Sequence, residues 1–161
     1  TGFLFVRGDW IERLRPLLVG SHSVQTSYNV PGIHFDLKPS ARRWEGGAFN
    51  MPGLQALAAS IGLFLEIGPE AVSARILDRA AAVRDAARRA GWTVYGPDDP
   101  RTQAGIVALE RPGVDPDSLV RRARERGIAL SARRGRLRIS PHLYNDADDL
   151  RRLEDALRGQ E

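Results

Sequence analysis

The chain has 161 residues, enough for one domain with a hydrophobic core, and 42% of them are hydrophobic, which excludes a disordered tail. It has no cysteine, so a disulfide, a thiolate metal site and a cysteine nucleophile are all excluded within this chain. A formal net charge of +4 raises nucleic acid as a partner, on charge alone. All but one of the 24 basic residues are arginines interleaved with acids, which favours solvated helix faces and predicts no nucleic-acid partner.

No apolar run approaches the roughly 20 residues that a membrane span needs. The N-terminus lacks the basic, apolar and small-residue regions of a signal peptide. We therefore expect a cytoplasmic protein without a membrane partner.

The first 50 residues are predicted to hold little regular structure. Residues 2–6 are predicted to form a buried strand, and because a chain rarely opens on a core strand we expect further residues upstream of Thr1. Asp9 is predicted to cap a short helical turn that Pro16 ends. Residues 19–50 are rich in Gly, Ser, Pro and His without periodicity, which indicates an ordered loop with contacts partly outside this chain.

Two helices are predicted next. Apolar side chains from Leu54 to Leu65 recur at helical spacing, so a helix is expected from about Met51. Gly68-Pro69 ends that helix and starts a second one, with proline in the first turn. Gly91 is predicted to end the second helix.

The remaining chain is predicted to alternate strands with two further helices. The predicted strands are residues 92–95, 104–109, 128–130 and 136–140. One helix is expected to start at Asp115-Pro116 and another to be capped by Asn145 or Asp146. The order from residue 54 predicts an α/β (α+β) fold, a short, mostly antiparallel sheet with helices packed on one side.

The last predicted strand carries the main candidate binding residue. Leu137 and Ile139 are expected on one face and Arg136 and Arg138 on the other. A guanidinium fork near the end of a strand suits a carboxylate, because two parallel charge-assisted hydrogen bonds fix its orientation. From the residues alone, a surface salt bridge and a ligand contact by Arg138 are both open.

The stretch around Arg138 resembles the end of class V aminotransferase-family proteins, where the pattern is Ser-x-Arg-x-Gly-x-hydrophobic-Arg-x-Ser-Pro-His-x-Tyr-Asn. The matching residues are Ser131, Arg133, Gly135, Arg138, Ser140, Pro141, His142, Tyr144 and Asn145. In that family the arginine before Ser-Pro-His binds the substrate α-carboxylate. The resemblance therefore implies this role for Arg138 and a second contact for Arg133, for which a place in an exposed turn is the alternative. His142 is expected to be a structural turn residue.

A second match is the segment 43–50, Arg-Trp-Glu-Gly-Gly-Ala-Phe-Asn, which resembles the family pattern Arg-aromatic-Glu-x-Gly-Thr-x-Asn. In relatives this loop reaches the phosphate of pyridoxal phosphate (PLP) in the neighbouring subunit. Ala48 stands where the threonine is expected, so a phosphate contact would rest on the backbone N–H groups of Gly47 and Ala48. A glycine-rich connection without a ligand is the alternative.

A third match is the segment 1–7, which resembles the strand that follows the PLP-binding lysine. The resemblance implies that this lysine lies upstream of Thr1, so that no catalytic residue is expected within the chain. Lys38 is the sole lysine, and it lies away from every family cue for that role. The histidines, including His34, show no metal-ligand spacing, so no metal site is predicted.

The three matches occur in family order and imply the C-terminal part of a fold-type-I PLP enzyme. Residues 1–50 would be the end of the large PLP-binding domain and residues 51–161 the small domain. The family implies a homodimer acting on an amino-acid or amine substrate by transamination, epimerisation or lyase chemistry. The sequence from Arg43 to Leu54 is most similar to the isopenicillin-N-epimerase-like branch. The cysteine desulfurases of the family use a cysteine nucleophile, which this chain lacks.

We expect the chain alone to be inactive, because the Schiff-base lysine is absent from it. The alternative hypothesis is a stand-alone, non-catalytic binding module that has kept the small-domain fold. A lysine-bearing segment in the upstream reading frame would favour the enzyme.

Overall fold

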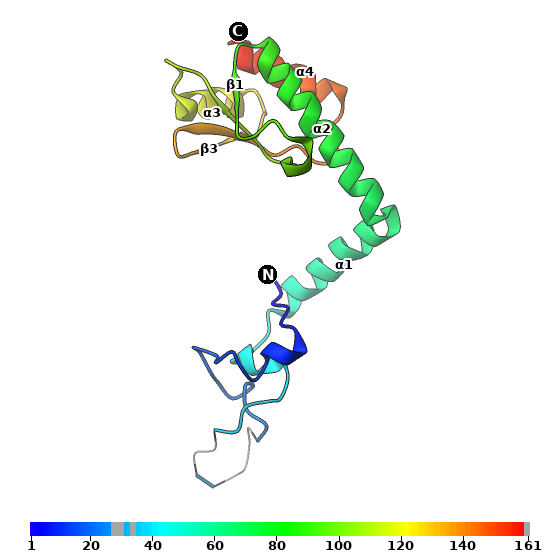
Figure 1. The fold of residues 1–161 in the computed structure, drawn as a ribbon, viewed down its shortest axis with the longest axis vertical. Helices are drawn as coiled ribbons and strands as arrows, with labels where there is room; N and C mark the ends of the chain where they lie inside the picture. Colours follow the sequence, from blue (N-terminus) through cyan, green and yellow to red (C-terminus); the bar gives the residue numbers. More distant parts are fainter. Residues whose placement is uncertain (27–30, 33–34, 160–161) are drawn as a thin grey trace. The chain divides into compact units, whose positions relative to one another are not determined.

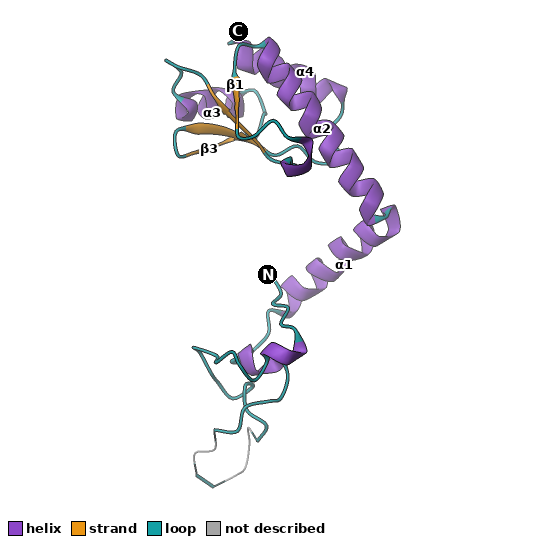
Figure 2. Cartoon of the chain, viewed as in Figure 1, coloured by secondary structure: helices purple, strands orange, loops and turns teal. Residues whose placement is uncertain are grey.

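The computed structural model describes residues 1–26, 31–32 and 35–159 (Figure 1). Its longer helices and strands occur in the order predicted after residue 50 (Figure 2). Their bounds are α1 Met51–Ile67, α2 Pro69–Arg89, β1 Thr93–Tyr95, β2 Val107–Glu110, α3 Pro116–Glu125, β3 Ser131–Arg133, β4 Arg136–Ile139 and α4 Ala147–Arg158. Short 3-10 helices are η1 Gly8–Trp10, η2 Ala41–Trp44 and η3 Pro100–Thr102.

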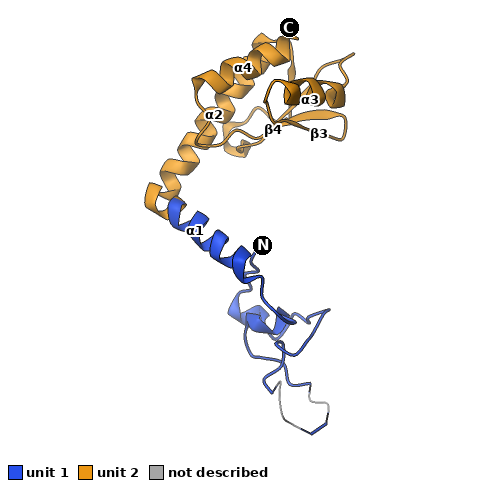
Figure 3. Ribbon diagram, turned by 180° about the vertical axis from the view of Figure 1, so that it is seen from behind, with its two compact units in different colours: residues 1–63 blue, residues 64–161 orange. Residues whose placement is uncertain are grey.

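The chain divides into two units, residues 1–63 and 64–161 (Figure 3). This division falls inside α1, a helix that has no buried residue of its own. The predicted division into a large domain over 1–50 and a small domain over 51–161 stays a prediction, because units within this chain do not test the domains of a longer protein.

The predicted buried strand at residues 2–6 is wrong. The segment has no strand assignment, and Phe3 and Phe5 are 82% and 80% exposed. A strand needs a neighbour to bond its backbone groups, and no described segment pairs with this one. The predicted helical turn after Asp9 is also displaced, because η1 begins at Gly8 and its first residues receive no side-chain cap.

The second unit holds a four-stranded sheet in the order β1-β2-β4-β3, with every neighbouring pair antiparallel. One face of the sheet is buried against α2, α3 and α4, which confirms the predicted sheet with helices on one side. The buried sheet residues are Val107, Leu109, Leu137 and Ile139. The helical residues in the same core include Ala80, Val83, Ala87, Leu119, Leu153 and Leu157.

The third strand lies three residues beyond its predicted position, at Ser131–Arg133 instead of 128–130. The N–H of Ile128 donates to the carbonyl of Ala123 at 2.8 Å, which closes the end of α3. Gly127 has a φ of 74°, as a left-handed helix C-terminus requires. The backbone at residue 128 therefore completes the helix, and strand pairing begins only after it.

Local capping fixes where α3 and α4 begin. The Asp115 carboxylate accepts hydrogen bonds from two N–H groups in the first turn of α3, as the predicted Asp-Pro start requires. Asp146 caps α4 and forms a capping box with Asp149. The indole N–H of Trp92 donates to the carbonyl of Leu157 at 2.9 Å, which joins the start of β1 to the end of α4.

No single helix among the described residues is long and apolar enough to cross a membrane. The pair α1 and α2 passes that test by length and composition when both are counted across their break.

The β3–β4 hairpin yields a stability prediction. Arg133 pairs with Arg136, so the turn has two residues, and both Arg134 (φ 52°) and Gly135 (φ 73°) are left-handed, which is a type I′ turn. Arg134→Asn should raise the free energy of unfolding by about 0.5–1 kcal/mol, because asparagine tolerates this conformation better than arginine. Thermal unfolding measures the change. Arg134→Ala, which removes the charge but keeps the backbone cost, is the control, and an equal effect of both variants would refute the explanation.

The contact between α2 and α4 yields a pH prediction. Both oxygens of Glu154 accept hydrogen bonds from Arg89, at 3.2 and 2.7 Å, and this holds the pKa of Glu154 below its usual value. A carboxylate with a lowered pKa in the folded state stabilises the fold above its unfolded pKa of about 4.3, and this stabilisation is lost as the pH falls through the folded-state pKa.

Glu154→Gln should therefore flatten the decline of the melting temperature below about pH 4.3. Asp155→Asn is the matched control, since Asp155 lies exposed on the same helix. If neither variant changes how the melting temperature falls in acid, the ion pairs of Glu154 with Arg89 and Arg158 do not contribute to stability there.

Candidate functional site

Arg138 lies on the open face of the sheet, opposite the face that the helices cover. Along β4 the side chains alternate between half-buried and buried, with Arg138 between buried Leu137 and Ile139. Its cross-strand neighbours are Ala108 on β2 and Ser131 on β3. Both neighbours are small, and the guanidinium makes no hydrogen bond or ion pair with any described residue. Arg138, the residue predicted to bind a carboxylate, is thus a half-buried arginine whose guanidinium has no partner among the described residues.

The other arginine of β4 is already occupied. Arg136 donates from Nε to a carboxylate oxygen of Glu110 at 3.0 Å. Its guanidinium also lies 3.6 Å from the ring centroid of Tyr95, in a cation–π contact. Arg133, at the end of β3, is exposed and has no partner within the described chain. The face therefore carries two unpaired guanidinium groups, at Arg133 and Arg138.

The Ser-Pro-His-x-Tyr-Asn segment after β4 forms a structural turn. The side-chain oxygen of Asn145 accepts from the N–H of His142 at 2.9 Å, and its amide donates to Asp149 on α4 at 2.9 Å. The imidazole of His142 stacks on Tyr144, with ring centroids 4.9 Å apart, and contacts Phe64 at 5.9 Å. The backbone of His142 thus forms part of this turn, as predicted, and the contacts fix the path from β4 into α4.

The glycine-rich loop before α1 leaves backbone donors available. The N–H groups of Gly47 and Ala48 bond to no acceptor among the described residues. A side chain added at Gly47 would meet no atom within 4 Å, so the space beside it is open. These features fit a phosphate group, which backbone N–H donors bind well. Residue 48 has no hydroxyl, so the side-chain donor expected from the family pattern is missing.

Buried polar contacts hold this loop in place. The hydroxyl of Ser23, a fully buried residue, donates to the carbonyl of Glu45 at 3.2 Å and accepts from the N–H of Gly20 at 3.1 Å. Gly20 packs so closely that a Cβ there would lie 2.0 Å from the carbonyl oxygen of Gly46. A larger residue at position 20 would therefore displace the loop.

Arg43 is a positioning residue whose role sequence reasoning missed. It is 5% exposed, and it donates to the carbonyls of Lys38 at 2.7 Å and Ile11 at 2.8 Å. A third bond reaches the Glu12 carboxylate at 2.6 Å. The guanidinium thus ties residues 11–12 and residue 38 together at the base of the loop. Arg43 was part of the recognised motif, but nothing in its spacing indicated which atoms it bonds.

Lys38 uses its amine for structure. Its Nζ donates to the carbonyl of His22 at 2.6 Å. At the other end of the loop, Asn50 accepts from the N–H of Gly53 at 3.0 Å and so caps α1. The amide of Asn50 also donates to the Thr1 hydroxyl at 3.3 Å. The first residue and the end of the loop are therefore neighbours.

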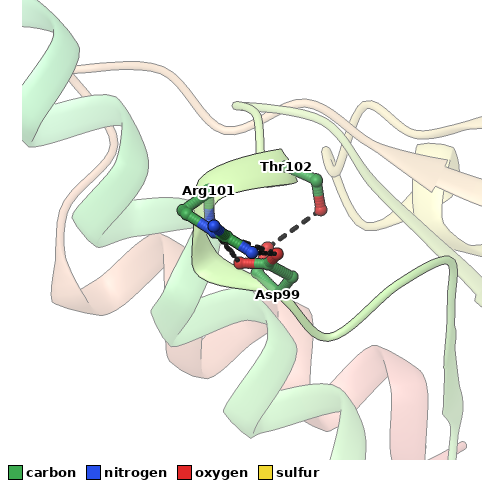
Figure 4. Close-up of polar contacts among 3 residues, drawn as sticks. All are labelled: Asp99, Arg101 and Thr102. Carbon is green, nitrogen blue, oxygen red and sulfur yellow. Dashed lines mark hydrogen bonds and ion pairs between the residues drawn. The ribbon is translucent and has the colours of Figure 1, made fainter.

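Among the described residues, the carboxylates with lowered pKa values belong to local turns, a helix cap and surface ion pairs. The Asp99 carboxylate, for example, accepts hydrogen bonds from the side chain and the backbone N–H of Arg101, and these lower the pKa of Asp99. The backbone carbonyl of Asp99 accepts from the Thr102 hydroxyl (Figure 4). This local network shapes an exposed turn. The described residues contain no group of three or more His, Cys, Asp or Glu that could hold a metal ion. His34 lies outside the described residues.

Comparisons with known proteins place the chain in a family. The class V aminotransferase family model matches residues 1–153. Isopenicillin N epimerase from Streptomyces clavuligerus is 32% identical over 170 residues, an alignment that covers 98% of this chain and 42% of the epimerase. The chain therefore spans less than half the length of this relative.

Two solved structures share the fold. The apo cysteine desulfurase from Thermococcus onnurineus NA1 has a TM-score of 0.83 at 20% identity, covering 96% of this chain and 41% of the desulfurase. A mutant of C-DES with glycine covalently linked to its PLP cofactor has a TM-score of 0.84 at 20% identity, covering 96% of this chain and 40% of that one. With the family model matching nearly its whole length, the chain belongs to the class V aminotransferase family, whose members are PLP enzymes.

Proposed function

We propose that this chain is the carboxylate-binding and phosphate-facing part of a PLP-dependent enzyme acting on an amino-acid or amine substrate. The observation that carries the proposal is Arg138, a half-buried guanidinium without a partner among the described residues and flanked by Ala108 and Ser131. An unpaired arginine fork between small side chains leaves room for a carboxylate to accept two parallel hydrogen bonds.

In the proposed enzyme the residues of this chain bind and orient. Arg138 holds the substrate α-carboxylate, and the backbone N–H groups of Gly47 and Ala48 donate to the cofactor phosphate. Arg43 and Ser23 keep that loop in place through the bonds described above. When bound, PLP supplies an electron sink that stabilises negative charge on the substrate α-carbon.

The amine that links to PLP is assigned to a lysine upstream of Thr1. The hydrogen bond between Thr1 and Asn50 supports this assignment, because it brings the start of the chain beside the end of the phosphate-facing loop. We further propose a cytoplasmic homodimer in which the loop serves the neighbouring subunit. The reaction is transamination, epimerisation or β-elimination. The chain has no cysteine, so persulfide formation at a protein thiol is not part of the proposal.

The cofactor prediction compares the chain with its extended reading frame. The longer protein, purified with added PLP, should show the visible imine band. Residues 1–161 alone should form no lysine-linked adduct after PLP and borohydride, because the amine of Lys38 is engaged with His22. Absorbance and peptide mass spectrometry check the two parts. The absence of the imine band from a folded longer protein, even after PLP supplementation, would defeat the proposed function.

The substrate prediction concerns Arg138. In the longer protein, Arg138→Ala should raise the KM for an amino-acid substrate about 10- to 150-fold, since a hydrogen bond to a charged group contributes about 1.5–3 kcal/mol. The imine band should remain, because Arg138 does not contact the cofactor in this proposal. Arg134→Ala removes the same charge from the hairpin turn and should leave KM unchanged. An unaltered KM in the Arg138 variant would show that the assignment is wrong.

A further inference from the structure

Two arginines on the open sheet face, Arg133 and Arg138, lie close enough to act on one ligand. Arg138 is opposite Ser131 and Arg133 is opposite Arg136 in the β3–β4 pair. Arg133 and Arg138 are thus diagonal neighbours on the same face, a relation with a backbone separation of about 7–8 Å. Long arginine side chains cover such a distance, so two carboxylates of a small molecule can each meet one guanidinium.

The charges around this pair leave it free to bind anions. Glu110 is the acidic residue on the same face, and its carboxylate accepts from Arg136. Arg136 also stacks on Tyr95, which holds its guanidinium on the β1 side, away from β3. The ion pair between Glu110 and Arg136 is locally neutral, so Arg133 and Arg138 are the strand residues that leave positive charge on the β3 side of this face.

We propose that Arg133 is a specificity-determining residue that binds a second carboxylate, so that the site around Arg138 takes dicarboxylic amino acids. The inference rests on the proposed function, because it names the substrate class of that same site. Arg138 binds the α-carboxylate, and Arg133 binds the side-chain carboxylate. Arg134 lies in the turn, beyond the last paired residues of the hairpin, and has no part in this binding.

The test needs no cofactor. The 161-residue chain is titrated with glutarate, adipate and the monocarboxylate butyrate, while NMR follows the arginine Nε–H signals. Glutarate or adipate should shift the signals of both Arg133 and Arg138, and should bind up to about fivefold more tightly than butyrate, the upper end expected of one added exposed ion pair. Arg133→Gln should abolish this advantage and leave butyrate binding unchanged. Arg134→Gln removes an equal charge nearby and should preserve the advantage.

Two results would overturn the inference. In the first, the wild-type chain binds glutarate and adipate with no higher affinity than butyrate. In the second, Arg133→Gln and Arg134→Gln reduce the affinity advantage of the dicarboxylates equally, since net charge alone would then account for the preference. In the longer protein, Arg133→Gln should raise the KM for glutamate or 2-aminoadipate and spare that for alanine. A missing imine band defeats the proposed function whatever the titration gives, whereas a failed titration with the band present defeats only the role of Arg133.

Discussion

The alternation of side chains along β4 is the constraint on which the candidate site depends. Leu137 and Ile139 are buried beneath the helices, and each contributes about 1.5–3 kcal/mol by leaving water. A slip of one residue would expose both and place Arg136 and Arg138 in the core, where an unpaired charge costs several kcal/mol. The register is therefore strongly fixed, and the same burial that builds the core presents Arg138 on the open face.

Elements whose signals are local were predictable from the sequence. Asp115 and Asp146 start α3 and α4 through bonds to residues two or three positions away, so the cap residues themselves indicate the boundaries. The strand at 2–6 could not be judged in this way, because its apolar composition says nothing about whether a neighbouring strand is available. The displaced third strand has a subtler cause, since the N–H of Ile128 completes α3 before sheet pairing can begin.

The candidate binding residues could be predicted from the sequence, but the contacts that hold them in place could not. The family motif predicts roles for Arg138 and for the loop at Gly47 and Ala48, and all three have unbonded donors among the described residues. The part played by Arg43 could not be anticipated, because it bonds to Ile11 and Glu12 more than 30 positions earlier in the chain, contacts that no local pattern encodes.

In the proposed enzyme, the three hydrogen bonds of buried Arg43 explain how the loop can bind phosphate without a hydroxyl at Ala48. A lost hydroxyl donor removes about 1.5–3 kcal/mol of hydrogen bonding, because the phosphate is a charged acceptor. Backbone donors remain useful only if the loop already holds them in position, since ordering a free residue costs about 1–2 kcal/mol of conformational entropy. Arg43 provides this order with three hydrogen bonds, and Ser23 adds two more. Phosphate binding would therefore depend on the buried base of the loop, which keeps the backbone donors of Gly47 and Ala48 in position.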